Sequence, residues 1–223
     1  MKVIPQRAAS IGAQVHQQLR DAIVRAELTP GTALSEAEIA ARYLVSRQPV
    51  REAFIRLAQE DLVEIRPQRG TFVKRIVMDD VLDARFVREA IEVAVAREAA
   101  GKADAAAIAR LQATLATQAV ATSNAEFLAA DEAMHREIAV IAGRESAWRV
   151  VDQIKAQMDR VRYLSYIDVS PAQRLIAQHS EIVEAIAAHD ANAAEAAVRA
   201  HMAEILQQLP ELARRYPEMF EGS

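Results

Sequence analysis

The chain has 223 residues, of which 52% are hydrophobic and 4% aromatic, and it contains no cysteine. That length is sufficient for two domains, and the absence of cysteine excludes disulfides and thiolate chemistry. No apolar run reaches membrane-spanning length and no signal segment opens the chain, so we expect a cytoplasmic protein. The net charge of −4 is uneven: residues 1–76 contain 12 Lys and Arg against 8 Asp and Glu, whereas the remainder contains 15 against 23. The positive charge therefore lies in the N-terminal part, where it favours contact with phosphate.

Two helical patterns occupy the first part of the chain. Residues 14–25 place apolar side chains on one helical face, formed by Val15, Leu19, Ala22 and Ile23. After a turn, Ser35 and Glu38 form a capping-box pattern, in which the two side chains bond to free backbone donors. This pattern predicts a short helix that continues to about Tyr43.

The segment from Ser46 to Glu52 predicts the start of another helix. Ser46 is a typical N-cap, whose side chain accepts a hydrogen bond from a free backbone donor, and the fixed φ of Pro49 suits the first turn. The apolar positions that follow share one face, which we expect to be buried: Val50, Ala53, Phe54, Leu57 and Ala58.

A different face of the same helix start is polar. Arg47, Gln48 and Arg51 lie within about one turn and point outward together. Guanidinium and amide groups can hydrogen-bond to guanine and adenine edges in the major groove of DNA. A short helix, a three-residue break and a second helix with outward polar residues predict a helix-turn-helix.

A basic hairpin is predicted directly after this helix. Residues 62–65 and 71–73 are short β-prone runs, and the connection from Arg66 to Gly70 places Arg66 and Arg69 at its tip. Such a hairpin beside a recognition helix is the wing of a winged helix, which we expect to lie along the phosphates or reach the minor groove.

From Leu34 to Ala53, and again from Leu62 to Val73, the chain resembles the GntR family of bacterial transcription regulators. The resemblance implies DNA contacts by the helix residues Arg47, Gln48 and Arg51 and by the wing glycine. Together with the residues beside them, the candidate DNA-binding residues are Ser46, Arg47, Gln48, Arg51, Arg69 and Gly70.

Two positions depart from the family pattern. Ala37 stands where some members have a further DNA-contacting arginine, which leaves part of the base readout open. Leu44 stands where the turn usually has glycine, so the turn either avoids positive φ or carries strain of about 1 kcal/mol. Because winged helices also bind proteins, and arginines on a helix are often only solvated, a protein-interaction module is the alternative function.

The composition changes after the wing to an alanine-rich, helical pattern. We predict a winged helix over residues 1–74, a linker over 75–79, an all-α ligand-binding and dimerisation domain over 80–214, and a tail over 215–223. Six helices are expected in the bundle, separated by breaks at Gly101, Thr122-Ser123-Asn124, Gly143, Ser170-Pro171, Asp190 and Pro210. The predicted fold class is therefore mainly α.

Four polar residues fall on apolar faces of this bundle. Asp131 and His135 are i, i+4 neighbours, while His179 and His201 each lie eleven residues from Asp190 on consecutive helices. If those two helices fold back on each other, the two imidazoles lie level. One divalent metal would satisfy all four side chains, although a single histidine is more often an ordinary hydrogen-bonded core residue.

Residues 80–210 resemble the all-helical FCD domain of the FadR-type branch of the GntR family. The resemblance implies that Asp131, His135, His179 and His201 bind a divalent metal, whereas His16 and His189 do not match. Three histidines and one aspartate suit zinc or nickel best, with manganese or iron less strictly matched.

A small carboxylate-containing metabolite is the expected effector, because a metal with open positions beside an inward arginine attracts an acid. Arg88 is the leading candidate for this contact, and Arg160 and Arg162 are weaker ones. For Arg88, a salt bridge with Glu92 one turn later is an equally good explanation.

An enzyme is not expected, although a His/Asp metal site can activate water. The sequence contains no zinc-protease motif, nucleophile elbow or glycine-rich phosphate loop, and it has only 6 glycines. A metal-dependent enzyme is thus the least favoured alternative. The expectation is a homodimeric, ligand-responsive repressor that binds a pseudo-palindromic DNA operator.

Overall fold

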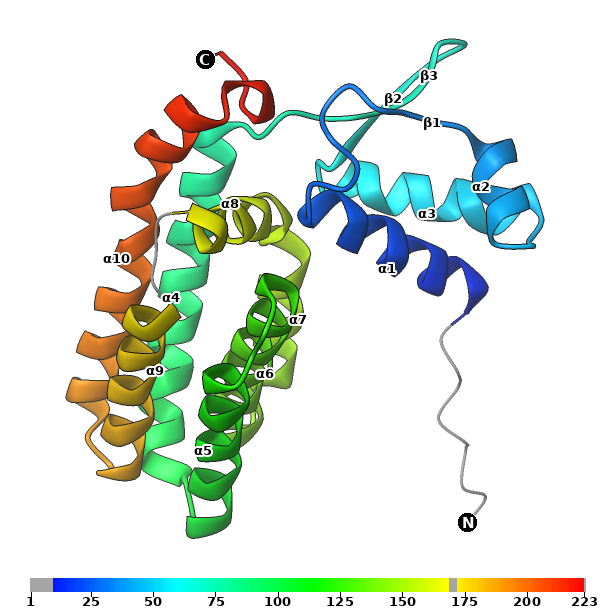
Figure 1. Ribbon diagram of the computed structural model, residues 1–223. Helices are drawn as coiled ribbons and strands as arrows, with labels where there is room; N and C mark the ends of the chain where they lie inside the picture. Colours follow the sequence, from blue (N-terminus) through cyan, green and yellow to red (C-terminus); the bar gives the residue numbers. More distant parts are fainter. Residues whose placement is uncertain (1–9, 169–171, 223) are drawn as a thin grey trace, which may run out of the picture. The chain divides into compact units, whose positions relative to one another are not determined.

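The computed structural model describes residues 10–168 and 172–222 (Figure 1), and the chain divides into two compact units after Arg75. Within the described residues, the first unit holds three helices and a small antiparallel sheet, and the second is built from helices. The mainly α class, with a winged helix-turn-helix ahead of an all-α bundle, is therefore confirmed.

The first unit is a winged helix. Its helices are α1 (Ile11–Val24), α2 (Glu36–Arg42) and α3 (Arg47–Gln59), and its strands are β1 (Ala33–Leu34), β2 (Val63–Arg66) and β3 (Gly70–Val73). The predicted apolar faces form its core, where Leu19, Ile23 and Leu57 are at most 4% exposed. As predicted, the Ser35 hydroxyl caps α2 by accepting a hydrogen bond from the backbone N–H of Glu38.

The wing contains one strand more than the predicted hairpin. The strand order is β1-β3-β2, and both neighbouring pairs are antiparallel, with Leu34 opposite Thr71 and Ile65 opposite Thr71 on the other side. Strand β1 has only two residues, so it has too little alternation to be recognised from sequence.

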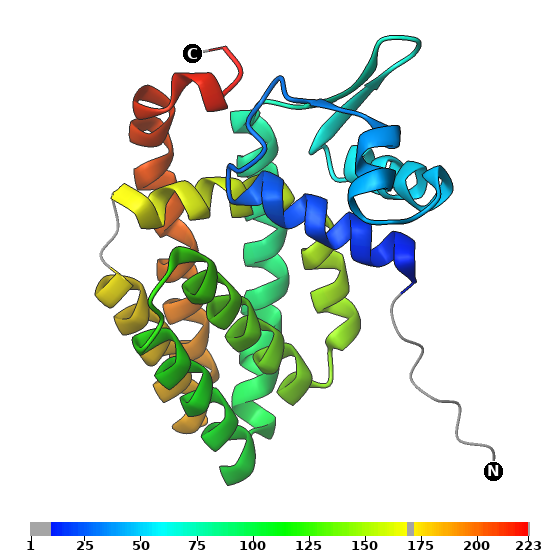
Figure 2. The same ribbon diagram turned by 45° about the vertical axis from the view of Figure 1, so that its right-hand side comes forward.

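Among the described residues, the second unit contains seven α-helices, one more than predicted, and a short 3-10 helix, η1 (Pro217–Met219). The α-helices are α4 (Met78–Lys102), α5 (Ala105–Ala119), α6 (Asn124–Ala142), α7 (Glu145–Ile154), α8 (Ala156–Asp168), α9 (Ala172–Ala187) and α10 (Ala191–Arg215). The long helices α4 and α10 pack side by side, and α8 runs across both of them (Figures 1 and 2). The predicted break at Ser170-Pro171 lies outside the described residues.

One helix boundary in this unit was missed and one predicted boundary was wrong. The α7–α8 break was missed because no glycine or proline marks it; Lys155 at this break is buried, with its Nζ 2.6 Å from Asp159 Oδ2. At Pro210 the helix does not end, and α10 continues through it to Arg215. Leu209 and Leu212 are buried on either side, so hydrophobic packing offsets the backbone hydrogen bond that proline removes.

The predicted C-terminal tail is packed into the second unit. Ile76 and Phe220 form a parallel β-bridge, with the Ile76 N–H donating to the Met219 carbonyl at 2.8 Å. Both bridge residues are 0% exposed. Phe220 thereby pairs with Ile76, the residue at which the second unit begins. Among the described residues, no helix has the length and apolar character needed to cross a membrane.

Candidate DNA interface and metal centre

The predicted DNA-reading side chains are exposed on the first turns of α3. Arg47, Gln48 and Arg51 are all accessible, while Val50 on the opposite face is completely buried. Arg51 forms a two-pronged ion pair with Glu36 of α2, with both hydrogen bonds 3.0 Å long. These hydrogen bonds hold the pKa of Glu36 below its usual value. The pair positions the Arg51 guanidinium across the two helices of the motif.

Ser46 lies at the N-cap of α3, but its side chain makes no capping hydrogen bond, contrary to the prediction. The physical reason is Pro49, which occupies the third helical position and has no N–H to donate. The preceding turn is strained rather than relaxed, because Leu44 has a φ of 55° and its side chain is 93% exposed.

The wing tip is a tight turn with two left-handed residues. Gln68 has a φ of 60° and Gly70 a φ of 106°, a conformation that favours glycine. Arg69 is exposed at this tip, whereas Arg66 lies over the Phe72 ring at 5.0 Å and bonds to a strand carboxylate. Arg69 is therefore the tip arginine placed to meet a ligand.

In the second unit, the four predicted metal ligands come together. Asp131 and His135 lie on α6, His179 on α9 and His201 on α10, and each is buried. One ligand atom from each residue lies within 4.8 Å of the others. The rings of His179 and His201 have centroids 4.6 Å apart, so the return of α10 along α9 brings the two imidazoles level. The other two histidines bond elsewhere, His16 to Glu60 and His189 to the Ala100 carbonyl.

The electrostatics of the cluster keep its groups in metal-binding states. Burial opposes ionisation of Asp131, but the Arg162 guanidinium and His179 hold its pKa well below the usual value. Burial lowers the pKa of His179, and burial together with the neighbouring imidazoles holds that of His201 well below normal. Asp131 is thus favoured as a carboxylate, and His179 and His201 as neutral imidazoles, which are the forms that coordinate metal ions.

Two acceptor atoms face each other inside the cluster. His179 Nδ1 lies 2.7 Å from Gln118 Oε1 and must donate a hydrogen bond to it. His179 Nε2 therefore carries no proton, and its lone pair faces Asp131 Oδ1 at 3.2 Å. Neither of the two facing atoms has a hydrogen-bond partner among the described residues. Two ligands of a tetrahedral ion with bonds of about 2.0–2.1 Å lie about 3.3 Å apart, so the pair fits a bound cation.

The three candidate effector arginines are buried but differ in their partners. Arg88 pairs with Glu92, as the salt-bridge explanation predicted, and its Nη1 atom is buried with no hydrogen-bond acceptor among the described residues. Arg160 donates to Gln157 at 3.1 Å, and burial lowers its pKa to about 10. Arg162 contacts the ligand residue Asp131 directly.

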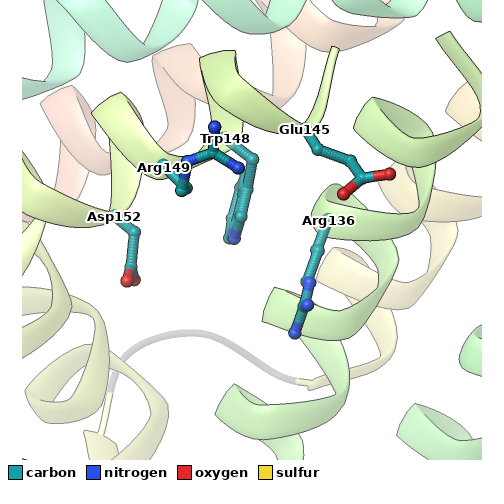
Figure 3. Close-up of a pocket in the computed structure, with 5 residues that line it drawn as sticks. All are labelled: Arg136, Glu145, Trp148, Arg149 and Asp152. Atoms are coloured by element: carbon teal, nitrogen blue, oxygen red, sulfur yellow. The ribbon is translucent and has the colours of Figure 1, made fainter. Parts of the chain in front are cut away.

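A separate polar pocket of about 270 Å³ adjoins the centre and is shown in Figure 3. Its lining residues are Arg136, Glu145, Trp148, Arg149 and Asp152. The Trp148 ring is parallel to that of His135 with centroids 6.5 Å apart, which connects the pocket wall to the cluster. Because two carboxylates offset the two arginines, the pocket has no charge preference for an anion.

Sequence reasoning missed the residues that hold the histidine rings. Gln118 on α5 bonds to His179, Gln178 on α9 bonds to His201 at 3.2 Å, and Glu92 on α4 lies 2.5 Å from His135. Glutamine on a helix carries no motif, so the only available signal was its place on an inward face. The pKa of Glu92 is about 2, because Arg88 and His135 outweigh the opposing effect of burial.

Known proteins resemble both units. Residues 11–73 match the family described as bacterial regulatory proteins, gntR family, and residues 83–204 match the FCD domain. The chain is 39% identical over 213 residues to the HTH-type transcriptional repressor RspR of Escherichia coli (strain K12), covering 94% of this chain and 93% of that protein.

Solved structures share the fold. E. coli McbR/YncC aligns with a TM-score of 0.78 at 20% identity, over 94% of this chain and all (100%) of that chain. A putative transcriptional regulator GntR from Rhodococcus sp. RHA1 aligns with a TM-score of 0.67 at 27% identity, over 91% of this chain and 99% of that chain.

These matches decide between the function classes left open by the sequence. The relatives are DNA-binding transcription regulators, which agrees with the expectation that the chain is not an enzyme and disfavours a pure protein-interaction module. With both units matched in order along the chain, this protein belongs to the GntR family of bacterial transcription regulators and carries an FCD domain as its C-terminal unit.

Proposed function

We propose that this protein is a homodimeric, ligand-responsive repressor whose C-terminal unit binds a divalent metal and a small organic acid. Family membership supports operator binding, and the description of the E. coli relative as a repressor supports the direction of control. The observation that carries the sensory half of the proposal is the buried cluster of one aspartate and three histidines.

For operator recognition, we assign base readout to the exposed α3 side chains and phosphate contacts to the helix start and the wing. The supporting feature is that these polar groups are accessible, while the rest of α3 is anchored by a buried apolar face. The assigned residues are Ser46, Arg47, Gln48, Arg51, Arg69 and Gly70. Because a two-fold dimer presents two such helices, we propose a pseudo-palindromic operator.

The dimer interface is proposed along α4. Phe86 is 71% and Val87 38% exposed, and both continue into an apolar groove of about 310 Å³ that Ile91 and Ala94 help to line. A large apolar stripe on an exposed helix face marks an interaction surface. Its proposed occupant is a second copy of this chain, because soluble homo-oligomers are most often two-fold dimers that pair the same surface of each copy.

The metal is proposed to be held by Asp131, His135, His179 and His201. This donor set of three nitrogens and one oxygen suits zinc or nickel best, with manganese or iron as weaker fits. When bound, the ion supplies a Lewis-acid position for a carboxylate oxygen. The FCD match supports this assignment, since that domain is associated with metal binding.

Arg88 is proposed to bind the carboxylate of the effector. Its buried Nη1 donor lacks an acceptor among the described residues, and its partner Glu92 lies 2.5 Å from the candidate ligand His135. A buried guanidinium donor without a partner is costly, and an anion would satisfy it. Arg160 and Arg162 remain weaker candidates, because Arg162 already contacts the candidate ligand Asp131 and Arg160 bonds to Gln157, which is not part of the cluster.

Two experiments test the proposal. A footprint on the DNA upstream of the protein's own gene should show a protected two-fold site, and the absence of any protected site would refute operator binding there. A thermal-shift screen of small organic acids should give stabilisation that disappears after chelation of the metal. Stabilisation that survives chelation would separate effector binding from the metal.

A further inference from the structure

We infer that four residues outside the ligand set fix which atom each ligand presents to the metal. These positioning residues are Glu92, Gln118, Gln178 and Arg162, and together they leave three imidazole Nε2 atoms and one carboxylate oxygen facing inward. The inference rests on the proposed metal site and deepens it. Each contact constrains one ligand independently.

For His179, the amide of Gln118 determines the tautomer. Gln118 Nε2 donates to the Ala130 carbonyl at 3.4 Å, so its Oε1 atom is the one that faces His179 Nδ1. An amide oxygen only accepts, and Nδ1 therefore carries the proton. The lone pair of His179 is consequently on Nε2, which points to Asp131 Oδ1.

The same logic applies to His201 through a longer chain of hydrogen bonds. Gln178 Nε2 donates to Glu204 Oε2 at 3.2 Å, and Arg174 lies 2.9 Å from the same oxygen. Because the Glu204 carboxylate accepts these bonds, Gln178 must turn its Oε1 atom toward His201 Nδ1, 3.2 Å away. His201 is again left with its lone pair on Nε2.

For His135, the acceptor is a carboxylate. Nδ1 lies 2.5 Å from Glu92 Oε2, and the other oxygen of Glu92 pairs with Arg88. An ionised carboxylate can only accept, so His135 also holds its proton on Nδ1. Neither ring nitrogen of His135 has a well-aligned hydrogen bond among the described residues, so the proton is assigned to Nδ1 by the close approach of the carboxylate oxygen alone.

Asp131 is constrained through its second oxygen. Arg162 contacts Oδ2, while Oδ1 faces His179. A carboxylate whose second oxygen is held by a guanidinium presents a single oxygen to a metal. The four contacts therefore define a three-nitrogen, one-oxygen site, and they give Arg162 a positioning role distinct from effector binding. Outer partners of metal-bound histidines typically fix the ring and raise its basicity in this way.

Gln118 provides the cleanest test because its replacement introduces no unpaired charge. Gln118→Leu should weaken the affinity for Zn²⁺ about 10–100-fold, measured by competition with a chromogenic chelator. Gln118→Glu keeps an acceptor for His179 Nδ1 and should restore affinity to within a few-fold of the unmodified protein. The matched control is Thr114→Val on the same helix α5, which removes a half-buried hydroxyl that donates to the Leu111 carbonyl at 2.7 Å.

Co²⁺ provides a second readout, because its visible absorption reports ligand identity and geometry. The Gln118→Leu spectrum should differ from that of the unmodified protein, while the Thr114→Val spectrum should not. If Gln118→Leu fails to fold, Gln178→Leu repeats the test at a half-buried position beside His201. Equal affinities and spectra for Gln118→Leu and the unmodified protein would overturn the positioning role. Failure of the unmodified protein to bind Zn²⁺ would instead overturn the metal site itself.

Discussion

The two units of this protein place their functional side chains in opposite environments. In the winged helix, Arg47, Gln48 and Arg51 are exposed on one short helix segment. In the helical unit, Asp131 and His179 are 0% exposed and come from helices far apart in the chain. Exposed groups are solvated and need no partner in the free protein, whereas buried ones must satisfy each other or a ligand.

This difference predicts how the two units respond to mutation. Removing a surface group of the winged helix should change DNA binding and leave folding nearly unaffected. Removing a group of the buried cluster should change folding and metal binding together, because its neighbours lose their partner. A surface variant of the winged helix that unfolds the protein, or a cluster variant that leaves folding unaffected, would contradict this difference between the two units.

The largest effect is expected for Asp131→Ala. It removes the nearest carboxylate partner of the buried Arg162 guanidinium, which keeps Asp159 Oδ1 at 3.4 Å, and breaking a buried pair costs up to about 3–5 kcal/mol. Urea unfolding of the metal-free protein measures this loss. A matched control on the same helix α6 is Glu137→Ala. This variant removes an ion pair with the exposed Arg110 of α5 and should cost about 1 kcal/mol or less. Equal losses for the two variants would contradict a buried charge network.

Phe220→Ala is expected to cost about 3 kcal/mol, since this fully buried side chain lies in the segment paired with Ile76. The same variant should accelerate tryptic cleavage after Lys74 and Arg75, which directly precede the bridge. Mass spectrometry of the early fragments measures this rate. An unchanged cleavage rate would mean that the C-terminal segment does not hold the start of the helical unit.

A smaller change in binding, with almost no change in folding, is expected for Arg51→Ala. Loss of a base contact should weaken specific operator binding by about 1–3 kcal/mol. Its ion pair with Glu36 is exposed to solvent and therefore contributes little to stability. Arg56→Ala removes the same charge from the last turn of α3 and serves as the control. An unchanged sequence preference in Arg51→Ala would reject its role in readout.

The smallest effect is expected at the turn of the helix-turn-helix. Leu44 adopts a φ of 55° with its side chain exposed, so Leu44→Gly should relieve strain and raise stability by up to about 1 kcal/mol. Thermal unfolding of the metal-free protein measures the gain. A loss of stability would mean that Leu44 makes contacts in the folded protein that outweigh its backbone strain.

The winged helix was largely predictable because its signals are local. The Ser35 cap and the apolar spacing of α3 each depend on a few neighbouring residues, and both hold in the structure. The Ser46 cap was wrong although equally local, because Pro49 lacks the required N–H. Strand β1 was missed because its two residues become a strand only by pairing with β3.

The helical unit was predictable only where long-range geometry follows from symmetry. His179 and His201 could be brought together because the turn at Asp190 is marked and both are equally distant from it. The contacts of Gln118 and Gln178 could not be predicted, since they depend on how separate helices pack. The break at Lys155 could not be predicted either, because no glycine or proline marks it in the sequence.

Metal analysis of the purified protein tests the central claim most directly. The protein should be prepared without a histidine tag, and its divalent metal content compared with that of a His179→Ala/His201→Ala double variant. A His16→Ala/His189→Ala double variant is the control, because these two histidines bond outside the cluster. We predict one ion per chain in the unmodified protein and the control, and none in the cluster variant. Equal metal content in all three proteins would contradict a metal centre at the buried cluster.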